Sequence, residues 1–288
     1  MECSPNIPRV GGDSIVPLDR VDHIIMTDYK LPPLPDAPVG DKDTMIGSHI
    51  ANLINDGDTI QVGIGGIPNA VCSALMGKRQ LGVHTEMMTT GIMRLMKAGA
   101  VDNSRKSLMP GKSVFAFAFG TEEMYNFMDR NDELWMTSGA WVNDPMVVGQ
   151  NDNMVSINTT VEIDLVGQCC SESIGYKQIS GSGGQSDTAI GAQRAKNGRS
   201  IIALYSTTLV KNPQTGEREE ISKIVPVLKE GAIVTLSRND VDWVVTEYGA
   251  VQLRGLDVRE RAQALISIAH PNFREELTRK ARDYEFIM

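Results

Sequence analysis

The 288-residue sequence lacks the features that mark several large classes of protein. No apolar run approaches the ~20 residues needed to cross a bilayer. The opening residues, MECSPNIPRVGGDS, have neither the charged start nor the apolar stretch of a signal peptide. We therefore expect a cytoplasmic protein with no membrane partner. A formal net charge of -8 also argues against nucleic acid as the main partner, because phosphate binding requires a basic surface.

Metal-binding and disulfide patterns are missing as well. The four cysteines, Cys3, Cys72, Cys169 and Cys170, have neither a zinc spacing nor a disulfide framework, so we interpret them as reduced and mostly buried. The four histidines are scattered and form no HExxH motif, so no metal is expected. No segment matches the dinucleotide fingerprint or the P-loop, which leaves a nicotinamide or nucleoside triphosphate cofactor poorly supported.

What the chain does contain is a proline-rich start followed by alternating helix and strand patterns. Residues 1–42 are expected to form an extended arm or interdomain linker, with LPPLPDAPVG (31–40) in a polyproline-like conformation. Residues 43–288 are expected to form the main folded domain. The alternation of strands and helices predicts an α/β fold, an open and mostly parallel sheet flanked by helices on both faces.

The local patterns predict these elements with approximate boundaries. Asp43 or Thr44 is expected to cap the first helix, and Pro68 to lie in the first turn of the second. Further helices are predicted at 91–99, 121–130, 186–196, 258–269 and 272–284. Strands are predicted at 59–62, 81–85, 113–120, within 154–167, and at 176–180, 200–205, 233–237 and 242–248, and a turn at 211–219. The strand 113–120, SVFAFAFG, is expected to be buried.

The strongest chemical candidate is Glu86. It follows the strand LGVHT, and the preceding strand TIQV ends in the glycine turn GIGG. Neighbouring parallel strands lie about 4.8 Å apart, so the amides around Val62 and Gly63 should lie beside the Glu86 carboxylate. A carboxylate next to donors for an oxyanion suits acyl transfer. An equally weighted interpretation is that Glu86 caps the helix that follows.

Other polar residues are weaker candidates. Glu162 and Asp164 alternate along one strand, and we interpret them as the solvated side of an edge strand rather than a catalytic pair. Asn143 and Asp144 precede a proline, which is typical of a turn. For Glu247 a buried ion pair and a ligand contact are equally consistent with the pattern, and His270 is expected to cap or end a helix.

Several segments together resemble the acetyl-CoA hydrolase/transferase family of class I CoA transferases, which includes the butyryl-, acetyl- and 4-hydroxybutyrate-CoA transferases. The resemblance covers about residues 43 to 277 and corresponds to the carboxyl-terminal catalytic domain alone. The matching runs are DGDTIQVGIGGIPNAV, GVHTEM, VNDPMVVGQNDNMVSINTTVEIDLVGQ, SGSGGQSD and VTEYGAVQLRGLDVRERAQALISIAHPNFREEL.

The resemblance implies a glutamate nucleophile, here Glu86, which forms an acyl-glutamyl anhydride and then a glutamyl-CoA thioester. It implies oxyanion donors in the backbone near Val62 and Gly183. It also implies CoA contacts, which fall on Gln61, Gly63, Gly181, Gly184 and Gln185. CoA would be a substrate, together with a short-chain carboxylate, and no permanently bound cofactor is expected.

Two departures from the family pattern concern activity. The family usually carries an aspartate where this chain has Thr90, and often an acid where it has Arg94. The family's amino-terminal domain has no counterpart in this sequence, so we expect a homo-oligomer or a complex with a separate amino-terminal domain. CoA transfer is the leading hypothesis. The alternatives are acyl-CoA hydrolysis and a non-catalytic CoA-binding subunit or remnant.

Overall fold

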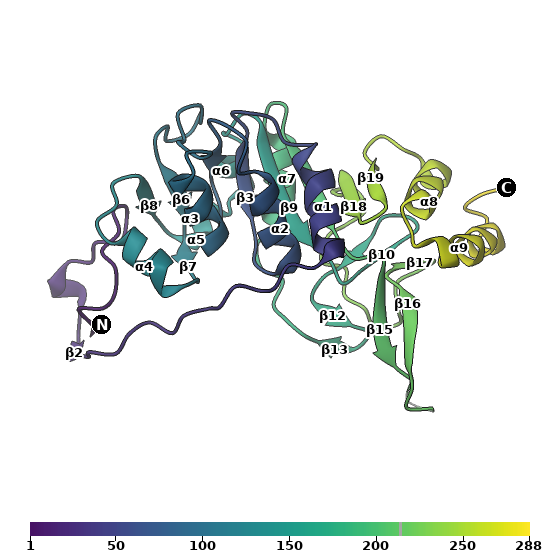
Figure 1. Cartoon of the computed structure of the whole chain (residues 1–288), viewed down its shortest axis with the longest axis horizontal. Helices are drawn as coiled ribbons and strands as arrows, with labels where there is room; N and C mark the ends of the chain where they lie inside the picture. The colour runs from purple at the N-terminus through teal and green to yellow at the C-terminus, as the bar shows by residue number, and fades with distance from the viewer. Residues whose placement is uncertain (213–214) are drawn as a thin grey trace.

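A six-stranded sheet runs through the centre of the computed structural model, which describes residues 1–212 and 215–288 (Figure 1). In sheet order the strands are β19 (Gly249–Gln252), β18 (Trp243–Thr246), β14 (Arg199–Ala203), β9 (Met154–Thr159), β3 (Thr59–Val62) and β4 (Gly82–Val83). Every neighbouring pair is parallel except β18 with β19. The predicted fold class, an open and mostly parallel sheet with flanking helices, is therefore confirmed.

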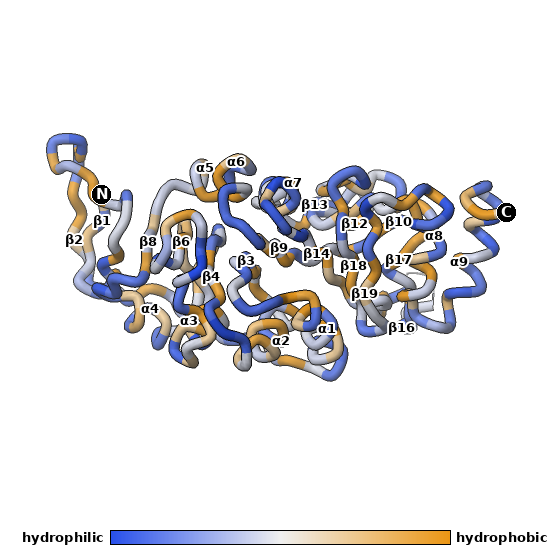
Figure 2. Tube along the Cα trace, turned by 90° about the horizontal axis from the view of Figure 1, so that it is seen from above, coloured by the Kyte–Doolittle hydropathy of each residue, from blue (hydrophilic) through white to orange (hydrophobic). Residues whose placement is uncertain are grey.

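Helices cover both faces of this sheet. The α-helices of the described chain are α1 (Asp41–Ala51), α2 (Gly66–Ala74), α3 (Thr90–Lys97), α4 (Glu122–Met128), α5 (Gly139–Val142), α6 (Pro145–Val148), α7 (Gln185–Arg194), α8 (Val258–Ser267) and α9 (Pro271–Asp283). Alternate residues of β14 serve different cores: Ile201 and Ala203 join the core with α1 and α2, whereas Ile202 joins the core with α8. Figure 2 shows the hydrophobic chain around α2 in orange. No described helix is long and apolar enough to span a bilayer.

Short strands outside the central sheet form small pairs and one three-stranded sheet. The pairs are β1 (Glu2–Cys3) with β2 (Ile25–Met26), β5 (Met87–Met88) with β7 (Phe117–Ala118), β6 (Ser113–Phe115) with β8 (Leu134–Met136), β12 (Ser173–Ile174) with β13 (Lys177–Gln178), and β15 (Thr207–Lys211) with β16 (Arg218–Ser222). The three-stranded sheet has the order β11 (Cys169–Cys170), β10 (Glu162–Asp164), β17 (Ile224–Val225). The turn predicted at 211–219 includes residues 213–214, which lie outside the described residues.

The segment between β2 and α1 is extended, as the prolines predict, and Figure 1 shows it as a long thread beside the body of the protein. We call residues 27–40 the arm. The Leu34 N–H donates to the Gly120 carbonyl at 2.8 Å, and the Asn69 side chain donates to the Ala37 carbonyl at 3.1 Å. Before the arm, residues 1–26 contain β1, β2 and a short 3-10 helix at Leu18–Arg20.

Three local predictions need correction. The first helix begins at Asp41 with Gly40 as its cap, and Asp43 instead accepts from the Gly40 N–H at 2.9 Å from inside the first turn. SVFAFAFG is not one buried strand but two short ones, β6 and β7, and Phe117 is 46% exposed. The segment 233–237 is not a strand and makes only an isolated bridge through Leu236.

The start of α8 gives a prediction about stability. Asp257 accepts from the Glu260 N–H at 2.8 Å and Glu260 accepts from the Asp257 N–H at 2.9 Å, so each side chain satisfies one free donor. We expect Asp257→Ala to lower the free energy of unfolding by about 1 kcal/mol, measured by urea denaturation. Asp283→Ala, which removes only an exposed ion pair with Arg279, should change it by less. Equal effects of the two substitutions would contradict this role for the cap.

Candidate active site

The two glycine turns singled out in the sequence both precede helices. Residues 63–65 connect β3 to α2, and Gly65 has φ +117°, a backbone conformation that favours glycine. Residues 179–184 connect β13 to α7, and Gly183 has φ +57°. A Cβ at Gly63 or at Gly183 would meet nothing within 4 Å. Both turns therefore present open backbone.

Glu86 lies just beyond β4, which pairs in parallel with β3 as the sequence predicted. Its backbone carbonyl accepts from the N–H of Ala116 at 2.9 Å and from that of Phe117 at 3.1 Å. These two bonds fall where the chain passes from β6 to β7. The interpretation of Glu86 as a helix cap is wrong, because Thr89 caps α3 by accepting from the Ile92 N–H.

The Glu86 carboxylate lies against the second glycine turn. A Cβ built on Gly184 would lie 2.7 Å from Glu86 Oε2 and 2.6 Å from Asn143 Nδ2. Three parts of the chain that are far apart in sequence therefore meet here, and only a glycine leaves room for both side chains. The Asn143 Oδ1 atom is buried and has no hydrogen-bond partner. The sequence pattern assigns Asn143 to a turn only, because a buried side-chain atom without a partner cannot be predicted from sequence.

One open cavity of about 610 Å³ contains the predicted site. Its lining includes all eight residues proposed from the sequence, namely Gln61, Val62, Gly63, Glu86, Gly181, Gly183, Gly184 and Gln185. Phe117 and Phe119 also line it, which explains why these side chains are not in the core. The structure thus brings together every predicted site residue, while their individual roles stay predictions.

Two of the polar side chains in this cavity already have partners. Gln61 Oε1 accepts from the Ile157 N–H at 3.2 Å and from Asn158 Nδ2 at 3.3 Å. Gln185 Nε2 donates to the Thr159 carbonyl at 3.3 Å. These bonds join β3, β9 and α7 at the floor of the cavity. Among the charged and amide side chains proposed from the sequence, Glu86 is therefore the one that the cavity presents to a ligand, because Gln61 and Gln185 already bond within the protein.

Asp187, in the first turn of α7, is a second carboxyl group near the site. Burial raises its pKa, and the nearby charges of Glu86 and Asp144 add to the increase. The sequence analysis missed this residue, because only the folded chain places it near Glu86. Among the described residues, no group of three or more His, Cys, Asp or Glu side chains could hold a metal ion.

Two buried basic residues lie close to the strand that carries Glu86. His84 is 1% exposed and its Nε2 lies 2.8 Å from the Val142 carbonyl. Burial lowers its pKa to about 4, and the charge of Lys106 adds to the decrease. Lys106 Nζ donates to the carbonyls of Val83 at 2.8 Å and Lys112 at 2.7 Å, and burial lowers its pKa to about 7. His84 thus connects β4 to the turn that holds Asn143.

The low pKa of His84 predicts a loss of stability in acid. Unfolded His84 binds a proton near pH 6.5 and folded His84 only near pH 4, so the unfolded state binds more protons in this window. Lowering the pH from about 7 to about 5 should therefore cost about 2 kcal/mol of unfolding free energy through this group. Urea denaturation of wild type and His84→Gln at both pH values measures the difference. An identical pH dependence in the two proteins would refute this assignment.

The structure contradicts the interpretation of Glu162 and Asp164 as solvent-exposed acids, and it gives Glu247 a lysine partner. Glu162 and Asp164 are not on the solvated side of an edge strand: they are 5% and 1% exposed, and β10 is the middle strand of its sheet. Asp164 accepts from the Gln168 N–H at 2.8 Å, so these acids bind backbone and are structural. Glu247 is 3% exposed, pairs at 3.3 Å with Lys42, whose side chain is half exposed, and accepts from Ser206 Oγ at 2.8 Å; the ion pair is present, but only its carboxylate is buried.

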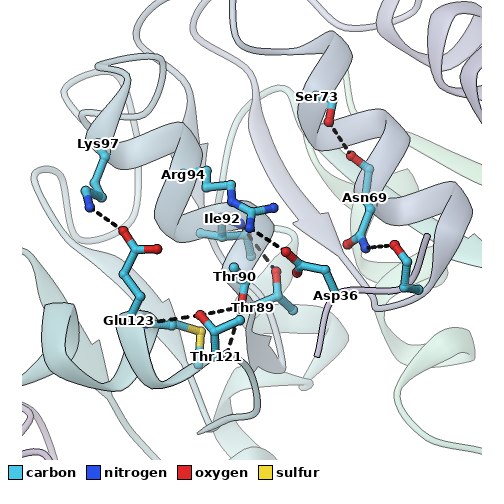
Figure 3. A network of polar contacts seen from close by, with 12 residues as sticks. Asp36, Asn69, Ser73, Thr89, Thr90, Ile92, Arg94, Lys97, Thr121 and Glu123 are labelled. Atoms are coloured by element: carbon cyan, nitrogen blue, oxygen red, sulfur yellow. Dashed lines mark hydrogen bonds and ion pairs between the residues drawn. The ribbon is translucent and has the colours of Figure 1, made fainter. Parts of the chain in front are cut away.

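The two unusual residues of α3 bind neighbouring segments (Figure 3). Thr90 Oγ1 accepts from the Thr121 N–H at 3.0 Å, which joins α3 to the start of α4. Arg94 pairs with Asp36 of the arm. Both residues therefore have structural partners next to the cavity rather than within it.

Comparison with known proteins gives a consistent picture. Residues 120–281 match the family model described as acetyl-CoA hydrolase/transferase C-terminal domain. The 4-hydroxybutyrate coenzyme A transferase of Clostridium kluyveri is 48% identical over 276 residues, which cover 96% of this chain and 62% of that protein. The succinyl-CoA:cyclohexane-1-carboxylate CoA transferase of Geobacter metallireducens is 46% identical over 98% of this chain and 63% of its own length.

A solved structure agrees with these relatives. RipA from Yersinia pestis superposes with a TM-score of 0.91 at 41% identity, over 99% of this chain and 63% of that one. The present chain therefore spans less than two thirds of the length of each protein it matches here.

Proposed function

We propose that this chain, which belongs to the acetyl-CoA hydrolase/transferase family, moves CoA between a short-chain acyl-CoA and a carboxylate, with Glu86 as the nucleophile. The observation that carries the proposal is the position of the Glu86 carboxylate, in one cavity with both glycine turns. A carboxylate nucleophile next to backbone donors is the arrangement that covalent acyl transfer requires.

The reaction proceeds through two kinds of covalent intermediate. The Glu86 carboxylate attacks the thioester carbonyl, the C–S bond breaks, CoA leaves as a thiolate, and an acyl-glutamyl anhydride remains. The thiolate attacks the glutamyl carbonyl, which releases the first carboxylate and leaves a glutamyl-CoA thioester. An acceptor carboxylate repeats the two steps in reverse, and the ionised Glu86 is regenerated.

The residues around Glu86 have separate roles in the proposed reaction. Backbone N–H groups at Val62 and Gly183 stabilise the oxyanion of each tetrahedral adduct, worth on the order of 10²–10³ in rate per donor. Gln61, Gly63, Gly181, Gly184 and Gln185 form the wall along which CoA lies. The Asn143 amide group and the Glu86 carboxylate both lie against Gly184, so the amide limits where the carboxylate can move.

The longer relatives bear on how the site is completed. This chain spans 62% and 63% of the lengths of the two named CoA transferases. We propose that residues 43–288 are the catalytic domain, that residues 1–42 connect it to an amino-terminal domain, and that this domain or a second copy of the chain completes the site.

Mass spectrometry of the purified chain after incubation with acyl-CoA tests the proposal. We expect a CoA adduct on the peptide that contains Glu86, removed by adding a carboxylate. Free thiol that accumulates without any carboxylate would indicate hydrolysis instead. A chain that binds CoA but never forms the adduct would support the non-catalytic subunit and contradict the proposal.

A further inference from the structure

A second hollow opens directly beside the nucleophile cavity. It has a volume of about 300 Å³, and Ile64 and Phe119 line both spaces. Its outer wall is the arm, from Leu34 to Ala37. The opposite wall of the nucleophile cavity is the glycine loop at 180–184, along which CoA lies in the proposed function. The hollow therefore adjoins the cavity of the Glu86 carboxylate at Ile64 and Phe119.

The polar side chains of the hollow are already bonded within the protein. Asp36 pairs with Arg94, and Asn69 Nδ2 donates to the Ala37 carbonyl at 3.1 Å. The hydroxyls of Thr89 and Thr90 accept from backbone N–H groups. The rest of the lining is Leu34, Pro35, Ala37, Ile64, Phe119 and glycine. Most of the lining is therefore apolar or already bonded, so hydrocarbon placed here would gain contacts, whereas a hydroxyl or carboxylate would exchange bonds to water for few partners.

From this arrangement, and resting on the proposed function, we propose that the hollow binds the apolar tail of the acyl group and sets the enzyme's preference for unsubstituted acyl chains. The Asp36–Arg94 pair is a positioning contact, because it holds the arm that forms the outer wall (Figure 3). The chain thereby uses its arm as part of the substrate site as well as a connection.

A smaller hollow of about 180 Å³ adjoins the cavity through Ile64 and Pro68 and has a different character. Lys223 lies over the Tyr205 ring there, 5.5 Å from its centroid. An acyl group ending in a carboxylate would be attracted to that cation. Binding in the larger hollow favours an apolar acyl tail, whereas binding in the smaller hollow favours a tail that ends in a carboxylate. Comparing the affinities for the two kinds of acyl-CoA shows which hollow binds the tail.

Equilibrium binding to the full chain carrying Glu86→Gln, which prevents transfer to residue 86, is the test. Isothermal titration should give a Kd for butyryl-CoA on the order of tenfold below that for acetyl-CoA, because two more methylenes are buried. The Kd for 4-hydroxybutyryl-CoA and for succinyl-CoA should be above that for butyryl-CoA. Tightest binding of succinyl-CoA, or equal binding of all four, would overturn the inference.

Variants of the wall locate the effect. Ala37→Phe fills the hollow and should bring the butyryl/acetyl affinity ratio close to one. Arg94→Ala should lower the ratio, and the exchanged pair Asp36→Arg with Arg94→Asp should restore it. Lys97→Ala is the matched control, because Lys97 lies on the same helix but pairs with Glu123 of α4 and not with the arm. A change in ratio as large in Lys97→Ala as in Arg94→Ala would contradict the role of the arm.

The titrations distinguish a failure of this inference from a failure of the proposed function on which it rests. Failure of CoA itself to bind would contradict the proposed function. Binding of CoA with affinities that do not depend on the acyl tail would contradict this inference alone.

Discussion

Replacing Glu86 by glutamine is expected to lower the rate of CoA transfer by on the order of 10⁴ or more, because the amide cannot form the anhydride. The carboxylate lies in the cavity and the residue's backbone bonds do not involve the side chain, so the fold should be retained. Transfer is measured as exchange between an acyl-CoA and a labelled carboxylate, with circular dichroism and the melting temperature as checks on folding.

Glu123→Gln is the matched control for this substitution. Glu123 is an exposed acid on α4 that pairs with Lys97, so the same chemical change there should leave transfer unaffected. A folded Glu86→Gln protein with turnover near that of Glu123→Gln would remove Glu86 from the mechanism.

Gly184→Ala is expected to lower transfer about 100-fold while leaving most of the stability intact. The added methyl group would lie 2.7 Å from Glu86 Oε2 and 2.6 Å from Asn143 Nδ2, so both side chains must move. Displacing the nucleophile by even 1 Å from its reactive geometry is enough for an effect of this size. The same exchange assay measures it, together with the melting temperature.

Gly77→Ala serves as the comparison for a glycine replacement. A Cβ at Gly77 would meet nothing within 4 Å, and this residue lies after α2, outside the cavity. Full activity in Gly184→Ala would show that the crowding at this glycine has no bearing on catalysis. Equal losses in both variants would point to a general effect of replacing glycine.

Local patterns predicted the parts of the fold that depend on local chemistry. The alternation of apolar strands with helices was enough to predict the parallel sheet, and the helix predicted at 121–130 is α4, which Thr121 caps by accepting from the Met124 N–H. The pairing of β3 with β4 followed from the rule that successive strands of such sheets are adjacent. The contact between Glu86 and the glycine turn after β13 could not be derived this way, because it joins distant segments.

The errors arose where burial depends on distant partners. Glu162 and Asp164 looked like the solvated face of a strand, yet backbone N–H groups from later loops surround them and satisfy their charge; the Lys229 N–H, for example, lies 3.3 Å from Glu162 Oε1. Phe117 looked like core because its neighbours are apolar. Its strand instead ends at the cavity, and the exposed Phe117 side chain forms part of the cavity wall.

The two hydrogen bonds to the Glu86 carbonyl have a consequence for the catalytic cycle. If the main chain at this residue shifted, the N–H groups of Ala116 and Phe117 would lose their acceptor together, at about 0.5–1.5 kcal/mol for each hydrogen bond. The peptide unit at Glu86 therefore stays in place whether the Glu86 side chain is free, acylated or bound to CoA. Each successive adduct is accommodated by side-chain torsions, so donor and acceptor acids meet the same stationary reaction centre.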